Sequence, residues 1–302
     1  MGHWRTSRPT SCSRVVYLKA VEMDLSPVRI DLYSGEASSR GSLTDEGAVF
    51  WSLSALLFAA SAVVTIVWCT SMSSMGKMPM PGGWTMSMTW MRMPGQTWSG
   101  AAASFLGMWV VMMAAMMLPS LVPTLWRYLQ AVGRPGEAPL GLLTALVGVG
   151  YFFVWTLFGM AAFPLGVALA AIEMQQPALA RVVPIAIGVV VLIAGAHQFT
   201  AWKAHHLECC REARGRGRTL PADARTAWRH GVRLGIHCSC GCAGLMAILL
   251  VVGIMDLRAT VLVTAAITVE RLAPAGQRVA RAIGAVIVGG GLVLIARAAG
   301  LA

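Results

Sequence analysis

The sequence predicts an all-α protein, a polytopic bundle of six to seven transmembrane helices. Hydrophobic residues make up 57% of the 302 residues, and charged residues only 12%. An average soluble domain carries about 25% charged residues. The few charges lie in clusters between long apolar segments. Because about 20 apolar residues cover the hydrocarbon core of a bilayer, we interpret these segments as membrane spans.

The elements follow from this pattern in order. Residues 1–46 are polar and contain no signal-peptide core, so we expect a poorly ordered cytoplasmic arm. Residues 47–302 are expected to form the bundle, with a Met-rich outer loop at 70–100. Pro119 and Pro123 should kink or end the second span. The sixth segment is short, which leaves six or seven spans. The apolar segments lie at about 47–69, 101–125, 140–171, 182–202, 231–255, 259–269 and 283–299.

The basic residues predict the orientation. The formal net charge is +11, but Lys and Arg lie in short loops beside apolar segments, which favours membrane topology and lipid contact over nucleic-acid binding. With the N-terminus inside and all seven segments spanning, few of the 24 Lys and Arg residues lie outside. This asymmetry predicts a cytoplasmic N-terminus. The outer residues are Lys77, Arg92, Arg181, Arg258 and Arg297.

The outer loop is rich in methionine and is broken by Pro and Gly, so we expect no regular structure there. Thioether sulfur is a soft ligand that favours Cu(I), and the loop could capture that ion. The alternative is a loop in the lipid interface, with Trp84, Trp90 and Trp98 as belt residues. The methionines are Met72, Met75, Met78, Met80, Met86, Met88, Met91 and Met93.

The second span carries a row of methionines. Met112 and Met116 are four residues apart and share a helix face, while Met113 and Met117 form an adjacent pair. A thioether row could pass a soft cation inward. The alternative is adaptable packing, which is the commoner use of methionine in a bundle.

Histidine and cysteine gather at two helix ends, after the fourth span and at the start of the fifth. Several are spaced i,i+4, which places two ligands on one side of a helix. Imidazole and thiolate together suit copper, zinc or iron. Thiols persist in the cytoplasm, whereas an inverted topology would favour disulfides. The candidate ligands are His205, His206, Cys209, Cys210, His237, Cys238, Cys240 and Cys242.

Glu270 ends the sixth segment and is followed by Arg271. A carboxylate at this position could act as a counter-ion or proton relay. The alternative is an interfacial pair with Arg271. His197 and Gln198, at the end of the fourth span, are further candidates for the site.

These residues resemble the signature of a bacterial family of predicted metal-binding integral membrane proteins, catalogued as a domain of unknown function. The resemblance covers about residues 101–297 and implies metal binding in the inner membrane. This chain departs from the family at Cys240 and Cys242, which are usually adjacent, and at His197 and His206, where an aromatic residue and a cysteine are common. The matching residues are Trp109, Met112, Ala115 to Pro119, Gln198, Lys203, Cys210, Arg211, Cys238, Cys242, Leu245, Met246, Gly253, Met255 and Glu270.

The leading hypothesis is a Cu(I)-handling membrane protein, for transport or delivery. The outer methionines would collect the ion, the second span would relay it and the inner His/Cys clusters would receive it. Copper is the favoured metal, and zinc and iron stay open. The expected partners are the bilayer and other membrane or metal-delivery proteins, with no nucleic acid. A binding protein is favoured over an enzyme; a membrane redox enzyme or a structural subunit of an assembly are the alternatives.

Overall fold

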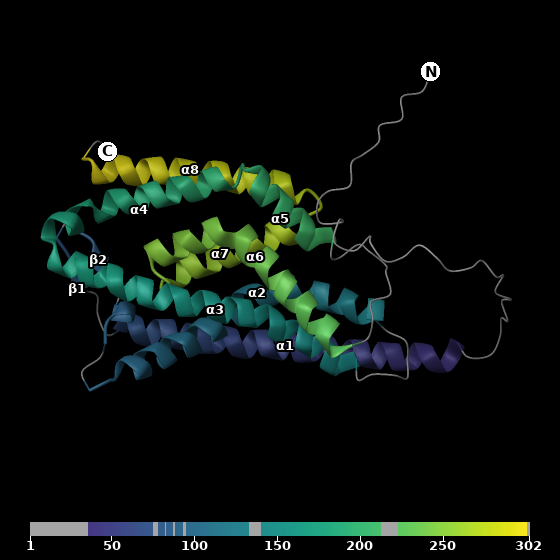
Figure 1. Ribbon diagram of the computed structural model, residues 1–302. Helices are drawn as coiled ribbons and strands as arrows, with labels where there is room; N and C mark the ends of the chain where they lie inside the picture. Colours follow the sequence, from purple (N-terminus) through teal and green to yellow (C-terminus); the bar gives the residue numbers. More distant parts are fainter. Residues whose placement is uncertain are drawn as a thin grey trace, which may run out of the picture. The chain divides into compact units, whose positions relative to one another are not determined.

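The computed structural model describes residues 36–74, 78–81, 83–86, 88–92, 95–132, 140–212 and 223–300. The predicted all-α class is confirmed, because eight α-helices account for nearly all of these residues. Contacts divide the chain into two units that meet between Val49 and Phe50. In the first unit the described residues form the start of α1. The helices are α1 (Glu36–Ser74), α2 (Trp98–Val132), α3 (Leu140–Gln175), α4 (Pro177–His197), α5 (Ala201–Glu212), α6 (Ala224–Val252), α7 (Leu257–Leu272) and α8 (Gly276–Ala298) (Figure 1).

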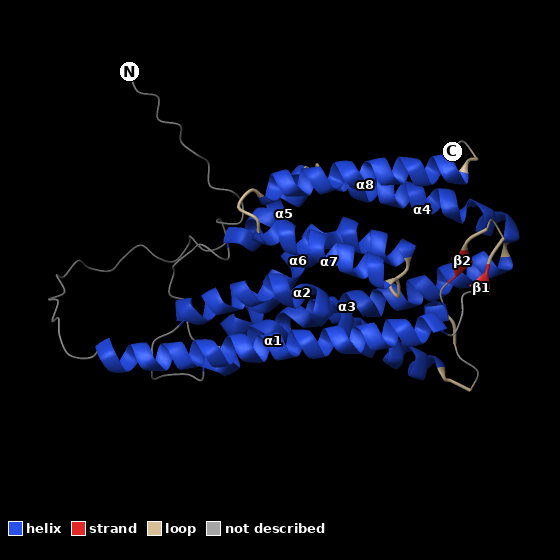
Figure 2. Cartoon of the chain, turned by 180° about the vertical axis from the view of Figure 1, so that it is seen from behind, coloured by secondary structure: helices blue, strands red, loops and turns tan. Residues whose placement is uncertain are grey.

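Among the described residues, six helices are long and apolar enough to cross a membrane: α1, α2, α3, α4, α6 and α8. Helix α7 corresponds to the short sixth segment and has 16 residues. At 1.5 Å per residue it extends about 24 Å, less than the roughly 30 Å of a hydrocarbon core. It lies alongside α6 and runs back toward the end where α5 lies (Figures 1 and 2).

Three helix boundaries differ from those expected. Helix α1 begins at Glu36, inside the predicted arm, while residues 1–35 lie outside the described part. Pro119 and Pro123 do not end α2, which continues to Val132; proline is tolerated in bundle helices, where neighbouring groups satisfy the freed carbonyl. Helix α4 does not continue into α5: Thr200 accepts a hydrogen bond from the Lys203 amide at 3.2 Å and so begins a new helix.

The core is centred on α2. In the most apolar 18-residue stretch of α2, 67% of the residues are buried, whereas 17% are buried in the most apolar stretch of α8. Trp109 is fully buried, and its indole N–H donates to the Trp155 carbonyl of α3 at 2.9 Å. The methionine row of α2 therefore points into the bundle rather than outward. Its buried members are Met108, Met112, Met113, Met116 and Met117.

Glycine lets two helix pairs approach closely. At the α3–α6 crossing, a Cβ on Gly231 would overlap the Val147 carbonyl. At the α4–α8 crossing, Gly195 and Gly291 meet backbone atoms of the facing helix, and the two helices lie side by side in both views (Figures 1 and 2). The α3–α6 contact matters for the site, because each of these helices supplies a residue to it.

The described part of the Met-rich segment corrects the expectation of no regular structure. Strands β1 (Met78–Pro79) and β2 (Thr85–Met86) pair antiparallel, with Met78 opposite Met86, and a 3-10 turn, η2 (Met88–Trp90), follows. Gly83 makes the tight turn possible through its φ of 77°. Trp84 donates to the Ala180 carbonyl at 2.8 Å and fixes the hairpin to the start of α4.

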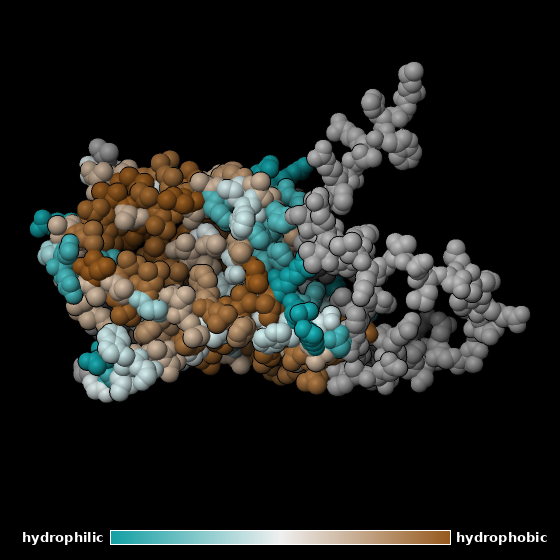
Figure 3. All heavy atoms as spheres, viewed as in Figure 1, coloured by the Kyte–Doolittle hydropathy of each residue, from teal (hydrophilic) through white to brown (hydrophobic). Residues whose placement is uncertain are grey.

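Large apolar side chains point outward from most helices. Val286 of α8 is 76% exposed and Leu262 of α7 is 70% exposed. On the face drawn in Figure 3, hydrophobic residues cover a broad area, and hydrophilic residues gather near the end where α5 lies. Apolar patches of this extent mark surfaces that contact protein or lipid rather than water.

Candidate metal site

Two thiols on α6 form the centre of the site. Cys238 and Cys242 are one helical turn apart, so their side chains share a face. Their sulfur atoms lie 4.0 Å from each other, and both residues are buried, with exposed fractions of 0% and 3%. Each of the six cysteines that the structure describes is a thiol, so the disulfide alternative is not adopted among them.

A third sulfur atom comes from α2. The Met117 Sδ lies 3.9 Å from the Cys238 Sγ, and Met117 is fully buried. Metal–thiolate bonds of about 2.3 Å place two sulfurs that share a trigonal or tetrahedral ion about 3.8–4.0 Å apart. The Cys238–Cys242 and Cys238–Met117 separations are both in this range, and we call these three residues the sulfur trio. Tyr151 of α3 completes the contacts of Cys238, with its hydroxyl 2.9 Å from the thiol.

A buried ion pair forms one wall of the site. The Lys203 ammonium of α5 donates to Glu270 Oε2 of α7 at 2.7 Å and to the Gly241 carbonyl of α6 at 2.6 Å. The two side chains are only 3% and 2% exposed. Glu270 therefore pairs with Lys203 in the interior, which corrects the expected interfacial pair with Arg271. The counter-ion and proton-relay roles of Glu270 stay predictions.

Arg271 lies on the neighbouring side and is also buried. Its guanidinium donates to the Ser120 hydroxyl of α2 at 3.0 Å and to the Cys210 sulfur of α5 at 3.4 Å. The exposed fractions of Arg271 and Cys210 are 5% and 6%. Arg271 lines one small cavity together with Cys238 and Cys242, so a positive charge lies beside the thiol pair.

The two predicted His/Cys clusters contact each other through one pair of histidines. His206 and His237 approach through their Nδ1 atoms at 3.1 Å, so one ring donates and the other accepts. His205 lies 3.7 Å from the Cys209 sulfur, as its i,i+4 spacing predicts. Burial, and then the nearby His205 and His197, lower the pKa of His206, which favours a neutral ring with an available lone pair.

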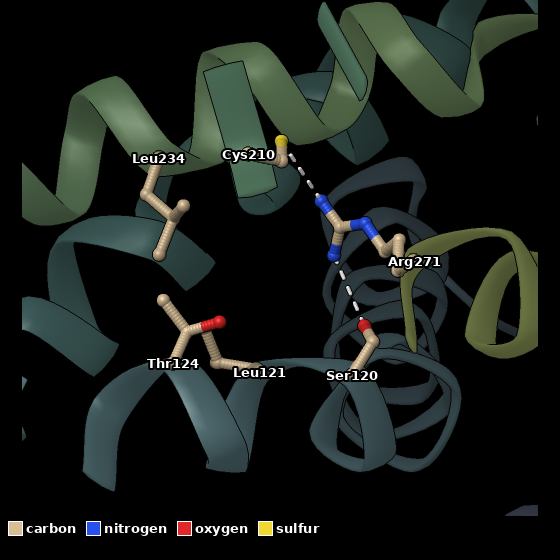
Figure 4. Close-up of a pocket in the computed structure, with 6 residues that line it drawn as sticks. All are labelled: Ser120, Leu121, Thr124, Cys210, Leu234 and Arg271. Carbon is tan, nitrogen blue, oxygen red and sulfur yellow. Dashed lines mark hydrogen bonds between the residues drawn. The ribbon is translucent and has the colours of Figure 1, made fainter. Parts of the chain in front are cut away.

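Two small cavities adjoin these residues. The first has a volume of about 10 Å³ and is lined by residues of both His/Cys clusters and by the buried charged residues. Its lining residues are Lys203, His206, Leu207, Cys210, His237, Cys238, Gly241, Cys242, Glu270 and Arg271. The second, of similar size, is lined by Ser120, Leu121, Thr124, Cys210, Leu234 and Arg271 (Figure 4). Each has room for about one small ion or water.

The remaining predicted residues lie on α2, α4 and α6. Met112 and Met116 are buried in the core of α2, and Cys240 is partly exposed on α6. His197 Nδ1 and both amide atoms of Gln198 are buried without a hydrogen-bond partner in the described part of the chain. Within the same described ranges, no three His, Cys, Asp or Glu side chains are placed to hold an ion together. The roles of these residues stay predictions.

Sequence reasoning missed four contributors: Met117, Tyr151, Arg271 and Ser120. Met117 belongs to the methionine pair adjacent to Met112 and Met116, and only the rotation of α2 in the bundle selects it. Lys203 was part of the family signature without an assigned role. Charged residues that face the interior of a helix bundle mark functional sites. This signal could have identified Lys203 and Arg271.

Residues 106–294, more than half of the chain, match the family model of PpoB2, described as a copper chaperone. The chain belongs to this copper chaperone family. No curated protein and no solved structure matches it. The matched residues include the sulfur trio and both buried cations, while the methionine hairpin lies outside them. The predicted resemblance to a metal-related family is thus confirmed, with copper as the metal in the family description. The membrane part of the resemblance stays a prediction.

Proposed function

We propose that this copper chaperone is an integral membrane protein that carries one Cu(I) ion between Cys238, Cys242 and Met117. The observation that carries the proposal is the sulfur geometry: two other sulfur atoms lie within 4.0 Å of the Cys238 thiol, and all three residues are buried. Thiolate and thioether are the soft ligands that select Cu(I) over harder divalent ions.

The charges around the trio suit the same ion. Two thiolates and one Cu(I) carry a net charge of −1, which would be costly to bury alone. The Arg271 guanidinium lies within 3.4 Å of the adjacent Cys210 sulfur and supplies a compensating positive charge. Lys203 is already neutralised by Glu270. Burial also keeps water and oxidants from the bound ion.

Residence in a bacterial inner membrane, with the N-terminus in the cytoplasm, is the second part of the proposal. It is supported by six long apolar helices and by the basic residues at one end of the bundle. In this arrangement that end faces the cytoplasm. The described arginines there are Arg127, Arg225, Arg229, Arg233, Arg278 and Arg281.

The direction of handling follows from the soft ligands outside the trio. Met78, Met80 and Met86 of the hairpin would collect Cu(I) at the outer face, and the buried methionines of α2 would relay it to the trio. The protein would then deliver the ion to an acceptor with a vacant copper site, in or beside the membrane. The proposed partners of the protein are the lipid bilayer and a metal-accepting protein.

The direct test is the copper content of thiol variants. The full chain, purified in dodecyl maltoside and incubated with Cu(I) under reducing, anaerobic conditions, should retain one copper per chain after desalting. Cys238→Ser and Cys242→Ser should lose most of it. Cys69→Ser removes another buried thiol and should keep it. Unchanged copper in the Cys238→Ser/Cys242→Ser double variant would reject the site.

A further inference from the structure

The two cavities beside the site share Cys210 and Arg271 as lining residues. The first cavity also contacts the thiols of Cys238 and Cys242. The second contains none of the sulfur trio and is lined by the hydroxyl-bearing Ser120 and Thr124 of α2. The Cys210–Arg271 contact therefore lies between the cavity beside the sulfur trio and the second cavity.

The second cavity lies on the way from the trio to the basic end of the bundle. Leu234 is one helical turn before Cys238 on α6, and Thr124 is two turns beyond Met117 on α2. The start of α6 and the end of α2 lie at the same end of the bundle (Figures 1 and 2). An ion that moved from the trio into the second cavity would approach that end.

Arg271 now occupies the position from which a metal would reach Cys210. Its guanidinium contacts the Cys210 sulfur at 3.4 Å and is held on its other side by Ser120 at 3.0 Å, an arrangement drawn in Figure 4. A Cu(I) ion bound to that sulfur would lie beside the guanidinium, and two cations so close together repel in a buried site. Cys210 can accept Cu(I) only after the guanidinium has moved away.

We propose that Cys210 is the exit ligand for Cu(I) and that Arg271 is the gate that controls its use. This inference rests on the proposed function. In the transfer, a Cu–S bond to Cys238 or Cys242 breaks while a Cu–S bond to Cys210 forms. The thiol proton of Cys210 passes to the released sulfur, and copper remains Cu(I). No oxidant or reductant is consumed.

Release kinetics test the exit ligand. The Cu(I)-loaded full chain is mixed with excess bathocuproine disulfonate, a Cu(I) chelator, and the absorbance of the chelate is followed. Cys210→Ser keeps an acceptor for Arg271 but loses the soft ligand. It should retain one copper and release it about tenfold more slowly, while Cys210→Met should restore part of the rate. Cys69→Ser is the matched control and should release copper at the unaltered rate.

Variants of Arg271 test the gate in the opposite direction. Arg271→Met removes the competing charge and should release copper about tenfold faster, whereas Arg271→Lys keeps the charge and should stay near the original rate. If Arg271→Met does not fold, Ser120→Ala removes one anchor of the guanidinium and should accelerate release to a smaller extent.

The outcomes separate this inference from the proposed function. An unaltered release rate in Cys210→Ser, or loss of its bound copper, would overturn the exit role while leaving the trio in place. Unaltered release in both Arg271→Met and Ser120→Ala would overturn the gate. Retention of copper by the Cys238→Ser/Cys242→Ser variant would instead reject the holding site on which both depend.

Discussion

At the scale of single residues, the site depends on polar side chains whose burial is unfavourable unless they have hydrogen-bond or ion-pair partners. Cys238 is fully buried and contacts Met117, Tyr151 and Cys242 from three helices. Lys203 and Glu270 are buried as a pair, with the second hydrogen bond of Lys203 satisfied by Gly241. Buried ion pairs add little stability over apolar residues, so this pair is better explained by its place beside the thiols.

Substitution Met117→Leu tests the third sulfur. The swap nearly conserves volume and should cost less than about 1.5 kcal/mol of stability, but it removes a soft ligand. We expect Cu(I) affinity to fall at least about tenfold, or about 1.4 kcal/mol, in a competition titration with a Cu(I) chelator. Met108→Leu, a buried methionine about 13 Å away along α2, is the control. Equal affinities of the two variants would remove Met117 from the site.

The ion pair makes a separate prediction about stability. Lys203→Met leaves the Glu270 carboxylate buried without its cation and should destabilise the protein by about 3–5 kcal/mol. The double variant Lys203→Met/Glu270→Leu removes both charges and should recover much of that loss. Thermal unfolding in detergent measures both. A double variant less stable than Lys203→Met would mean that each charge has other essential partners.

At the scale of elements, the site is assembled by helix crossings that only glycine permits. The α3–α6 crossing at Gly231 brings the Tyr151 hydroxyl to within 2.9 Å of the Cys238 thiol. Helix α7 is short but necessary, because it supplies both Glu270 and Arg271 from consecutive positions. The break between α4 and α5 turns α5 so that Lys203 and Cys210 face the thiols of α6.

Substitution Gly231→Ala tests this assembly. The added Cβ would overlap the Val147 carbonyl, so α3 and α6 must separate. Overpacking of this kind costs about 1–3 kcal/mol, and we expect bound copper to fall as well. Gly289→Ala is the matched control: it lies within α8, and its Cβ meets no atom within 4 Å. That variant should be neutral or up to about 1 kcal/mol more stable.

At the scale of the whole molecule, the apolar helix surfaces and the basic helix ends support the proposed place of the protein in a bilayer. Six of the described arginines lie at the end of the bundle where α2 ends and α6 and α8 begin, while Arg92, Arg181, Arg258 and Arg297 belong to the other end. If the protein spans the membrane as proposed, the positive-inside rule orients the proposed exit route toward the cytoplasm.

Reporter fusions test that orientation. Helix α7 runs back toward the α5 end and so returns the chain to the cytoplasmic side before α8 crosses again. Alkaline phosphatase, active only outside the cytoplasm, should therefore be active when fused after residue 302 and inactive when fused within residues 213–222. A cytoplasmic fluorescent protein should give the opposite pattern at both sites. Phosphatase activity at 213–222 would invert the topology and place the site at the outer face.

The sequence predicted more of the fold than of the site. Composition and apolar segments were sufficient for the all-α class, since each helix needs about 20 apolar residues of its own. Cys238 and Cys242 were predicted because i,i+4 spacing within one helix fixes their separation. Met117 was missed because the choice between adjacent faces of α2 depends on how that helix is rotated against α6.

Other contacts at the site join distant parts of the chain. Lys203 and Glu270 are 67 residues apart, and Arg271 and Ser120 are 151 apart. No local periodicity encodes such pairings. The pairing of His206 with His237 likewise follows from the packing of α5 against α6.

The central claim is that one Cu(I) ion is held by sulfur from Cys238, Cys242 and Met117. X-ray absorption at the copper edge, on the copper-loaded full chain, tests it most directly. We expect a Cu(I) edge and a first shell of three sulfur atoms at about 2.3 Å, falling to two in Met117→Leu. A first shell of nitrogen or oxygen, or a Cu(II) edge under anaerobic reducing conditions, would contradict it.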